Sequence, residues 1–226
     1  QVPLFENERV AVVFSNTLDF HQKDGVRLRE EIHYDSPPPQ GMIFERLLCG
    51  NFISFVTTIF RRSAVEKVGG SWFEESFEII TDFDLYMRLS REFEFRYVDE
   101  VLCEYRWHES NTSQLKMNLT VSELQQMLGK LLLHDNELMT RLPTQMMLYL
   151  AFVFNHELVI AWRRGQRSRA RSIAMIIFRL TGDWKILVKW CLIPFCSYDR
   201  LLALAEKLRG LSRRRRGTPQ NAKLGT

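Results

Sequence analysis

The sequence of 226 residues has few cysteines, and its four show no short paired spacing. A small disulfide-stabilised scaffold is therefore excluded. No charged head followed by an apolar stretch and a small-residue cleavage site marks a secretory leader. We therefore expect a cytoplasmic protein with reduced thiols. The four cysteines stand in apolar stretches, which predicts that they are buried: Cys49, Cys103, Cys191 and Cys196.

The composition is not that of a disordered or collagen-like chain, because 46% of the residues are apolar and 12% are aromatic. Charge is distributed unevenly. Residues 1–115 carry 12 Lys and Arg against 20 Asp and Glu, a net charge of −8. Residues 116–226 carry 19 against 7, a net charge of +12. This asymmetry predicts two units with different electrostatic partners.

The first half of the chain mixes strand and helix patterns. Apolar and β-branched runs predict strands at 10–14 and 57–60, and alternation predicts another at 93–97. Helical spacing predicts short helices at 43–48, 63–68 and 82–91. This order predicts an α/β layer structure.

Beyond about residue 115 the strand patterns disappear. Apolar stripes at helical spacing predict a helical extension over 116–212, followed by a basic and polar tail over 213–226. The segment 145–164 is apolar nearly all round, and a membrane span needs about 20 such residues. Because Asn155-His156-Glu157 interrupts its middle, we expect a buried helix instead.

Two carboxylates, Asp82 and Asp84, lie at the start of the helix predicted at 82–91. Residues two apart on a helix point about 200° apart, so the two side chains need separate explanations. Thr81 followed by Asp84 fits a capping box, which predicts a structural role for Asp84. Asp82 either stabilises the helix N-terminus through its charge or is available as a base.

Three ordered elements resemble the second half of the catalytic domain in family-two glycosyltransferases. Phe60-Arg61-Arg62 and Val68-Gly69-Gly70 are similar to the family's Arg-Arg-like pair and its Val-Gly-Gly-Phe-like turn. Thr81 to Arg88 resembles its Glu-Asp-x-Asp-Leu-x-x-Arg motif, and Tyr105-Arg106-Trp107-His108 its terminal Tyr-Arg-x-His element. The likeness covers roughly residues 1–113. It implies a partial GT-A domain (nucleotide-diphospho-sugar transferase, Rossmann-like) over 1–115, followed by an all-α extension.

The resemblance implies an inverting enzyme that moves a sugar from a nucleotide-sugar donor to a hydroxyl acceptor. Asp82 stands at the position of the catalytic base. Arg106 and His108 stand where the family binds the donor diphosphate, and His108 also where it helps to hold a divalent cation, Mg²⁺ or Mn²⁺. Without the resemblance, we interpret His108 as a partly exposed imidazole at the end of a strand.

On the acceptor side, the resemblance implies a turn at Gly69 and Gly70 that lets the backbone approach substrate, because glycine has no Cβ. Trp72, with Phe73 beside it, would offer an apolar platform to a sugar face. The alternatives stay open: the glycine pair also predicts a simple helix stop, and both aromatic residues also suit a core.

The chain departs from the family pattern at two points. Thr81 replaces the usual glutamate, and no Asp-x-Asp motif lies upstream of Asp82. We therefore expect a fragment or a truncated form with an incomplete metal site and with weak or absent activity by itself. The alternative is a non-catalytic interaction module that retains part of the fold.

The basic second half offers two kinds of partner. Arginines at 163–171 and 213–216, beside amphipathic helices, suit an anionic membrane surface, although they also suit a solvated face. A peripheral protein at the inner face of the cell membrane would act on sugar or lipid-linked acceptors, such as those of cell-envelope polysaccharides. Nucleic-acid binding is an alternative function, because Trp184 and Trp190 could stack on bases, but no ordered RNA or DNA motif supports it.

Overall fold

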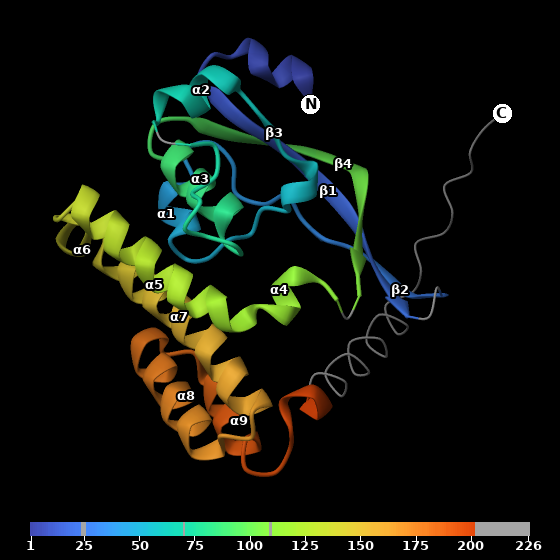
Figure 1. Cartoon of the computed structure of the whole chain (residues 1–226), viewed down its shortest axis with the longest axis vertical. Coiled ribbons are helices and arrows are strands. Elements are labelled where there is room, and N and C mark those ends of the chain that lie inside the picture. Colours follow the sequence, from blue (N-terminus) through green and yellow to red (C-terminus); the bar gives the residue numbers. More distant parts are fainter. Residues whose placement is uncertain (24–25, 70, 109, 202–226) are drawn as a thin grey trace. The chain divides into compact units, whose positions relative to one another are not determined.

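The computed structural model describes residues 1–23, 26–69, 71–108 and 110–201. It divides into two compact units, Gln1–His156 and Glu157–Thr226. The first unit combines a mixed β-sheet with helices, which confirms the α/β expectation at the level of fold class (Figure 1). The more specific GT-A domain and its limit at residue 115 stay predictions.

The sheet is built around one long strand, β1 (Val10–Lys23). One edge of β1 pairs in parallel with β4 (Glu94–Trp107) along most of its length. The other edge pairs antiparallel with β3 (Ile59–Phe60) near its start and with β2 (Val26–Ile32) near its end. The sequence predicted only the apolar beginning of β1, because its second half is polar and gives no β-branched run.

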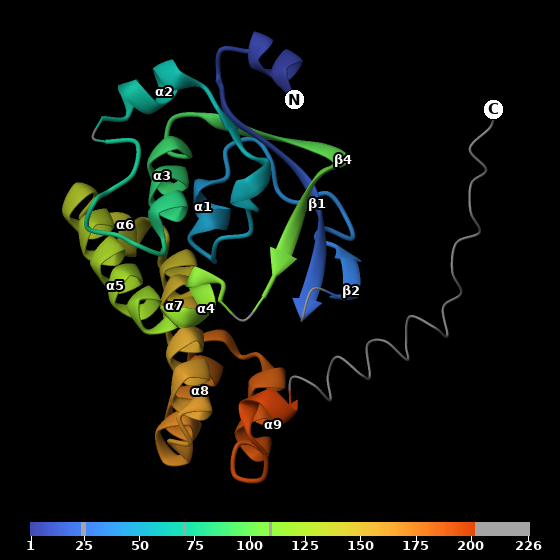
Figure 2. The same cartoon turned by 45° about the vertical axis from the view of Figure 1, so that its right-hand side comes forward.

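Short helices surround the sheet, and most of them agree with the sequence expectations within a few residues. The helix expected at 82–91 is α3 (Thr81–Leu89), and Figures 1 and 2 both show it between the sheet and α5. Of the strand expected at 57–60, only Ile59–Phe60 form β3, and Thr57 is the last residue of a 3-10 turn, η2 (Phe55–Thr57). The remaining elements of the first unit are η1 (Val2–Glu6), α1 (Phe44–Leu47), α2 (Arg62–Lys67), α4 (Thr112–Leu115), α5 (Met117–His134), α6 (Leu138–Arg141) and the first part of α7 (Pro143–Arg163).

The core of the first unit has α3 at its centre. Phe83, Leu85 and Tyr86 are buried there, together with sheet residues such as Phe14 and Phe95. The same core contains apolar residues from the helices beyond position 115: Leu124, Met127 and Leu131 of α5, and Met146, Tyr149 and Val153 of α7. Helices expected to form an extension therefore complete the core beneath α3.

Helix α7 corresponds to the apolar helix expected at 145–164. Within the described part of the chain it is the helix long and apolar enough to cross a membrane, by length and composition alone, and 33% of its most apolar window is buried. Within α7, Nδ1 of His156 lies 3.0 Å from the carbonyl oxygen of Phe152, one turn earlier. The expectation that α7 is a buried helix and does not span a membrane stays a prediction.

The second unit continues from the end of α7 through α8 (Arg167–Thr181) and α9 (Trp184–Leu192). Buried residues of α8, such as Ala170, Ile173 and Ala174, recur at helical spacing as predicted. The chain turns into α9 at Gly182, whose φ of 67° lies in the left-handed region. The basic tail at 213–226 lies outside the described residues.

The expectation of buried cysteines is wrong. Cys49 and Cys191 are exposed, whereas Cys103 and Cys196 are half-buried, and all four are free thiols. Cys49 shows the reason: it lies immediately after α1, one position beyond the apolar pair Leu47 and Leu48 that enters the core. An apolar neighbourhood along the sequence did not predict which direction the thiol faces.

Candidate active site

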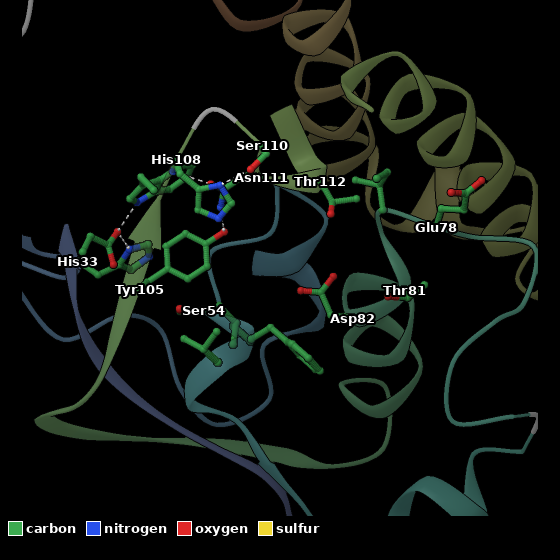
Figure 3. Close-up of a pocket in the computed structure, with 16 residues that line it drawn as sticks. His33, Ser54, Glu78, Thr81, Asp82, Tyr105, His108, Ser110, Asn111 and Thr112 are labelled. Carbon is green, nitrogen blue, oxygen red and sulfur yellow. Dashed lines mark hydrogen bonds and ion pairs between the residues drawn. The ribbon is translucent and has the colours of Figure 1, made fainter. Parts of the chain in front are cut away.

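A cleft of about 540 Å³ opens in the first unit at the ends of β1 and β4. Asp82 and His108, which are distant in sequence, both line it. Figure 3 shows the Asp82 carboxylate on one side of this space and the side chains of Tyr105 and His108 across from it. The structure therefore brings both candidate residues into one cleft. The other lining residues are Asp19, His33, Ile53, Ser54, Phe55, Val56, Glu78, Ile79, Thr81, Trp107, Ser110, Asn111 and Thr112.

Asp82 is the second residue of α3, so its carboxylate lies at the helix N-terminus. Its Oδ1 accepts a hydrogen bond from the backbone N–H of Phe83 at 2.8 Å, and Asn51 Nδ2 lies 3.5 Å from Oδ2. Burial nevertheless dominates and raises the pKa of Asp82 above its ordinary value. A carboxylate with a raised pKa holds a proton more strongly, which makes it a stronger general base.

A carboxylate from α5 fixes the backbone that leads into α3. Both side-chain oxygens of Glu123 accept backbone hydrogen bonds, from Glu78 at 2.9 Å, Ile79 at 3.0 Å and Ile80 at 3.1 Å. Glu123 is only 6% exposed, so water competes little for these donors. Since Asp82 follows this segment directly, Glu123 positions the candidate base. No sequence pattern indicated this contact, because the partners are more than 40 residues apart.

Asp84 does not form the expected capping box. Helix α3 begins at Thr81 with Ile80 before it and has no side-chain cap there. The carboxylate of Asp84 instead pairs with Arg88 one turn later, at 3.0 Å between Oδ2 and Nε. The interpretation of Asp84 as a structural residue stands, whereas the proposed cap was wrong, because Thr81 lies inside the helix and the N–H of Asp84 donates to the carbonyl of Ile80.

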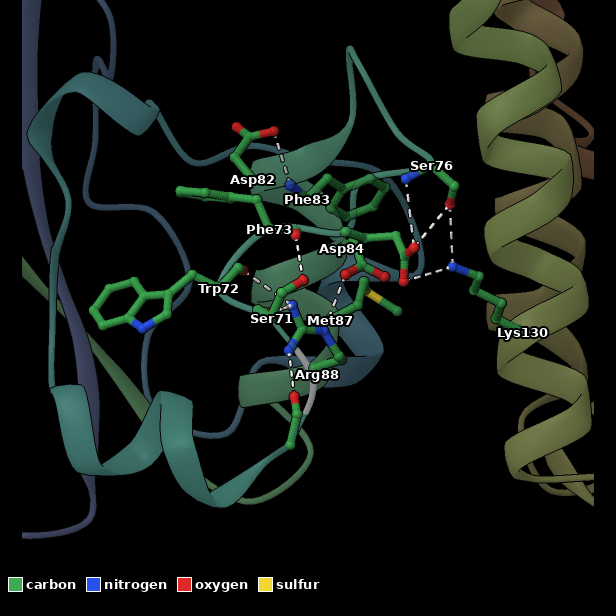
Figure 4. Close-up of polar contacts among 12 residues, drawn as sticks. Ser71, Trp72, Phe73, Ser76, Asp82, Phe83, Asp84, Met87, Arg88 and Lys130 are labelled. Atoms are coloured by element: carbon green, nitrogen blue, oxygen red, sulfur yellow. Dashed lines mark hydrogen bonds and ion pairs between the residues drawn. The ribbon is translucent and has the colours of Figure 1, made fainter.

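The other nitrogens of Arg88 hold the loop expected to face the acceptor. Nη1 donates to the carbonyl of Gly69 at 3.0 Å, and Nη2 donates to the carbonyls of Ser71 at 3.2 Å and Trp72 at 3.1 Å (Figure 4). Three carbonyls and one carboxylate therefore converge on one guanidinium group. The arginine of the 81–88 motif fixes the loop 69–72 against α3.

Gly69 and Trp72, which were expected to contact the acceptor, do not line the cleft, and Gly69 lines a separate pocket together with Arg88. Gly69 has a φ of 75°, which is left-handed and agrees with a helix stop after α2. Trp72 is 38% exposed, and its ring packs edge-on against Phe60. Phe73 reaches closer, because its ring packs edge-on against Phe55, which lines the cleft. Gly70 lies outside the described residues.

The two residues expected to bind the donor diphosphate take different positions. The backbone N–H of His108 donates to Asn111 Oδ1 at 2.6 Å, and its Nδ1 lies 2.8 Å from the hydroxyl of Ser110. Arg106 does not line the cleft; its Nη1 donates to Gln22 Oε1 at 3.4 Å. Alternation along β4 explains this difference, since Tyr105 and Trp107 line the cleft and the residue between them faces away.

The cleft also holds a carboxylate–imidazole pair that sequence reasoning missed. Asp19 is buried in β1, and His33, just after β2, donates from Nδ1 to its Oδ2 at 2.9 Å. Thr17 donates to Oδ1 at 2.7 Å, and Trp107 Nε1 lies 3.4 Å from Oδ2. Although burial tends to raise the pKa of Asp19, the hydrogen bonds from His33 and Thr17 lower it overall. An isolated histidine outside every motif gave no reason to select it.

The divalent cation that the resemblance implies lacks a complete set of ligands here. Among the described residues, no three His, Cys, Asp or Glu side chains converge closely enough to hold a metal ion. His108 contributes a single imidazole, and Mg²⁺ or Mn²⁺ prefers several oxygen ligands. The residues present therefore do not fit such a cation by themselves.

Comparison with known proteins gave no assignment: no protein-family model matches the chain, and no curated protein matches it. The resemblance to family-two glycosyltransferases stays a prediction that rests on the three motifs and on the geometry of the cleft.

Proposed function

We propose that the first unit is a partial GT-A domain of an inverting glycosyltransferase, which moves a sugar from a nucleotide-sugar donor to a hydroxyl acceptor. One observation carries this proposal: the carboxylate of Asp82 and the imidazole of His108 line the same cleft of about 540 Å³. The cleft is large enough for a sugar-sized ligand, and aromatic and polar side chains line it together.

The proposed chemistry needs one base at the acceptor. The acceptor oxygen attacks the anomeric carbon and forms the new C–O bond, while the bond from that carbon to the donor phosphate oxygen breaks. The hydroxyl proton passes to the carboxylate of Asp82, and the nucleoside diphosphate leaves with the bonding electron pair. Attack opposite to the leaving group inverts the anomeric centre. General-base help of this kind contributes roughly 10² to 10⁴ in rate.

The side chains around Asp82 prepare it for this role. Glu123 fixes the segment before it, and Phe83 orients one carboxylate oxygen. His108 faces Asp82 across the cleft (Figure 3), where it would contact the departing diphosphate. Mg²⁺ or Mn²⁺ would neutralise phosphate charge in such an enzyme, but its ligands would have to come from outside the described residues, so no step is assigned to it here.

The test is a transfer assay on the full-length natural protein with a panel of nucleotide-sugars and hydroxyl acceptors, read as nucleoside diphosphate release and product formation. We expect Asp82→Asn to lower the transfer rate by about 100-fold or more, while donor binding is retained. Glu75→Gln, which alters an exposed carboxylate, is the matched control and should leave the rate unchanged.

Equal rates for the wild type and Asp82→Asn would refute the assignment of the base. A wild-type protein that binds a sugar ligand in this cleft but transfers none would favour the non-catalytic interaction module. Retention of anomeric configuration in the product would contradict the single-displacement chemistry.

A further inference from the structure

The second unit carries an exposed apolar stripe on α9 and the turn after it. Trp184 is 65% exposed, Val188 46% and Phe195 84%, and Cys191 is exposed between them. Positions 184, 188 and 191 recur at helical spacing, so they share one side of α9, and Phe195 lies in the turn that follows the helix. Ile186 and Ile193 are buried on a different side. The apolar residues of the stripe are therefore presented to the exterior of this unit.

Basic side chains flank the stripe. Lys185 and Lys189 each follow a stripe residue by one position, which places them along one border. Trp190 lies along the other border, and the guanidinium of Arg171 stacks on its ring at 4.0 Å. Apolar side chains between cationic ones are typical of a surface that lies in a membrane interface.

A basic hollow of about 700 Å³ lies between α8 and α9 beside Trp190. Arg167, Arg171 and Arg179 line it, together with the hydroxyl-bearing Ser168 and Ser172. Nε of Arg171 is buried and has no hydrogen-bond acceptor among the described residues. Three guanidinium groups and two hydroxyls are donors that suit a phosphate group.

The acidic residues of this unit do not cancel this charge. Residues 157–201 contain nine Lys and Arg and three Asp and Glu. Each acid is engaged: Glu157 pairs with Arg169, Asp199 pairs with Arg163, and Asp183 accepts the backbone N–H of Lys185 at the start of α9. Because a second copy would carry the same excess of positive charge, self-association through this surface is disfavoured.

We propose that α8 and α9 form a binding surface for an anionic lipid bilayer, in which the hollow takes a lipid phosphate and the stripe of Trp184, Val188 and Phe195 enters the boundary between headgroups and acyl chains. This inference stands on the second unit alone and does not depend on glycosyl transfer. For an enzyme that acts on lipid-linked acceptors, the surface would bring the chain to its substrate.

The test is co-sedimentation of the full chain with vesicles of phosphatidylcholine, with and without phosphatidylglycerol. We expect binding only with phosphatidylglycerol and release at high salt, because screened charges attract less. Trp184→Ser with Phe195→Ser should weaken binding by about tenfold or more, and Arg171→Gln with Arg179→Gln by a similar factor. Leu133→Ser and Arg62→Gln, which alter exposed residues of the first unit, are the matched controls and should bind as the wild type does. Circular dichroism establishes that each variant is folded.

Several results would overturn the proposal. These are no binding to phosphatidylglycerol vesicles at low salt, equal binding to phosphatidylcholine alone, or unchanged binding by the stripe or arginine variants. Inorganic phosphate that abolishes binding at low millimolar concentration would identify a free-phosphate site instead. Tighter, Trp190-dependent binding to single-stranded RNA would identify a nucleic-acid surface. A Trp184 that is shielded from collisional quenchers before lipid is added would mean that another part of the protein covers the stripe.

Discussion

The contact of Glu123 with the backbone before α3 makes a prediction that joins stability to the candidate site. In Glu123→Gln the side chain keeps one acceptor oxygen, but an NH₂ group replaces the other, so one or two of the three charge-assisted hydrogen bonds are lost. A hydrogen bond to a charged group contributes about 1.5–3 kcal/mol, and a buried donor left unpaired adds a cost. We expect the free energy of unfolding to fall by about 2–4 kcal/mol.

Urea unfolding followed by circular dichroism measures this loss, and amide hydrogen exchange assigns it to residues 78–82. Exchange there should accelerate well before exchange in β1. Glu75→Gln is the matched control, because it changes an exposed glutamate of the same loop. If Glu123→Gln unfolds at the same urea concentration as the control and leaves exchange at 78–82 unchanged, the positioning role of Glu123 is refuted.

Three further predictions concern residues in or beside the cleft. Burial raises the pKa of Asp82, so its contribution to stability is greatest at low pH, where it is protonated, and is lost as the pH rises through that raised pKa. Asp82→Asn should therefore raise the free energy of unfolding at pH 7 by about 0.5–2 kcal/mol, measured by urea unfolding. A loss of stability in this variant would count against a strained base. The pKa of Asp19 is lowered, so its contribution to stability is present above the ordinary value of 3.8 and is lost as the pH falls below it. Asp19→Asn should lower the free energy of unfolding by about 1–3 kcal/mol at pH 7 and reduce the loss of stability between neutral and acid pH. An unchanged loss of stability at acid pH would contradict the pairing with His33. Arg88→Met should release the loop 69–72 and increase its proteolysis several-fold, and a loop that stays resistant would show that other contacts hold it.

The sequence predicted the elements that local pattern determines. The apolar spacing of α3 predicted the helix, and the alternation at Phe93, Phe95 and Tyr97 predicted the beginning of the following strand, which continues to Trp107. The helices α5 and α8 were also predicted, since each has a long stripe with a period near 3.6 residues, and α7 was predicted from a segment that is apolar nearly all round. The end of α2 followed from Gly69, which takes the left-handed conformation that glycine favours.

Contacts between distant segments could not be predicted in the same way. The polar half of β1 is a strand because β4 and β2 pair with it on both edges, and no residue pattern within 15–23 announces this. The contact of Glu123 with the backbone of residues 78–80 joins segments more than 40 residues apart, so no local pattern predicts it. The pairing of Asp19 with His33 depends on the register between β1 and β2.

The residues of the candidate site likewise fall into those that sequence motifs predicted and those that depend on the folded structure. Motif spacing found Asp82 and His108, and the structure places both in one cleft. Motif spacing did not reveal that Arg106 faces away from the cleft, which depends on the alternation of β4 at Tyr105 and Trp107. It also missed the exposed stripe on α9, because a helix with apolar residues on several sides does not show from sequence which side is covered.

The measurement that tests the central claim most directly is amide hydrogen exchange of the full-length natural protein with and without a panel of nucleotide-sugars. A bound sugar donor should slow exchange together in the segments 53–56, 78–82 and 105–112, which contain residues that line the cleft, while α8 stays unchanged. Protection confined to one of these segments, or located outside the cleft, would contradict the account that Asp82 and His108 serve the same ligand.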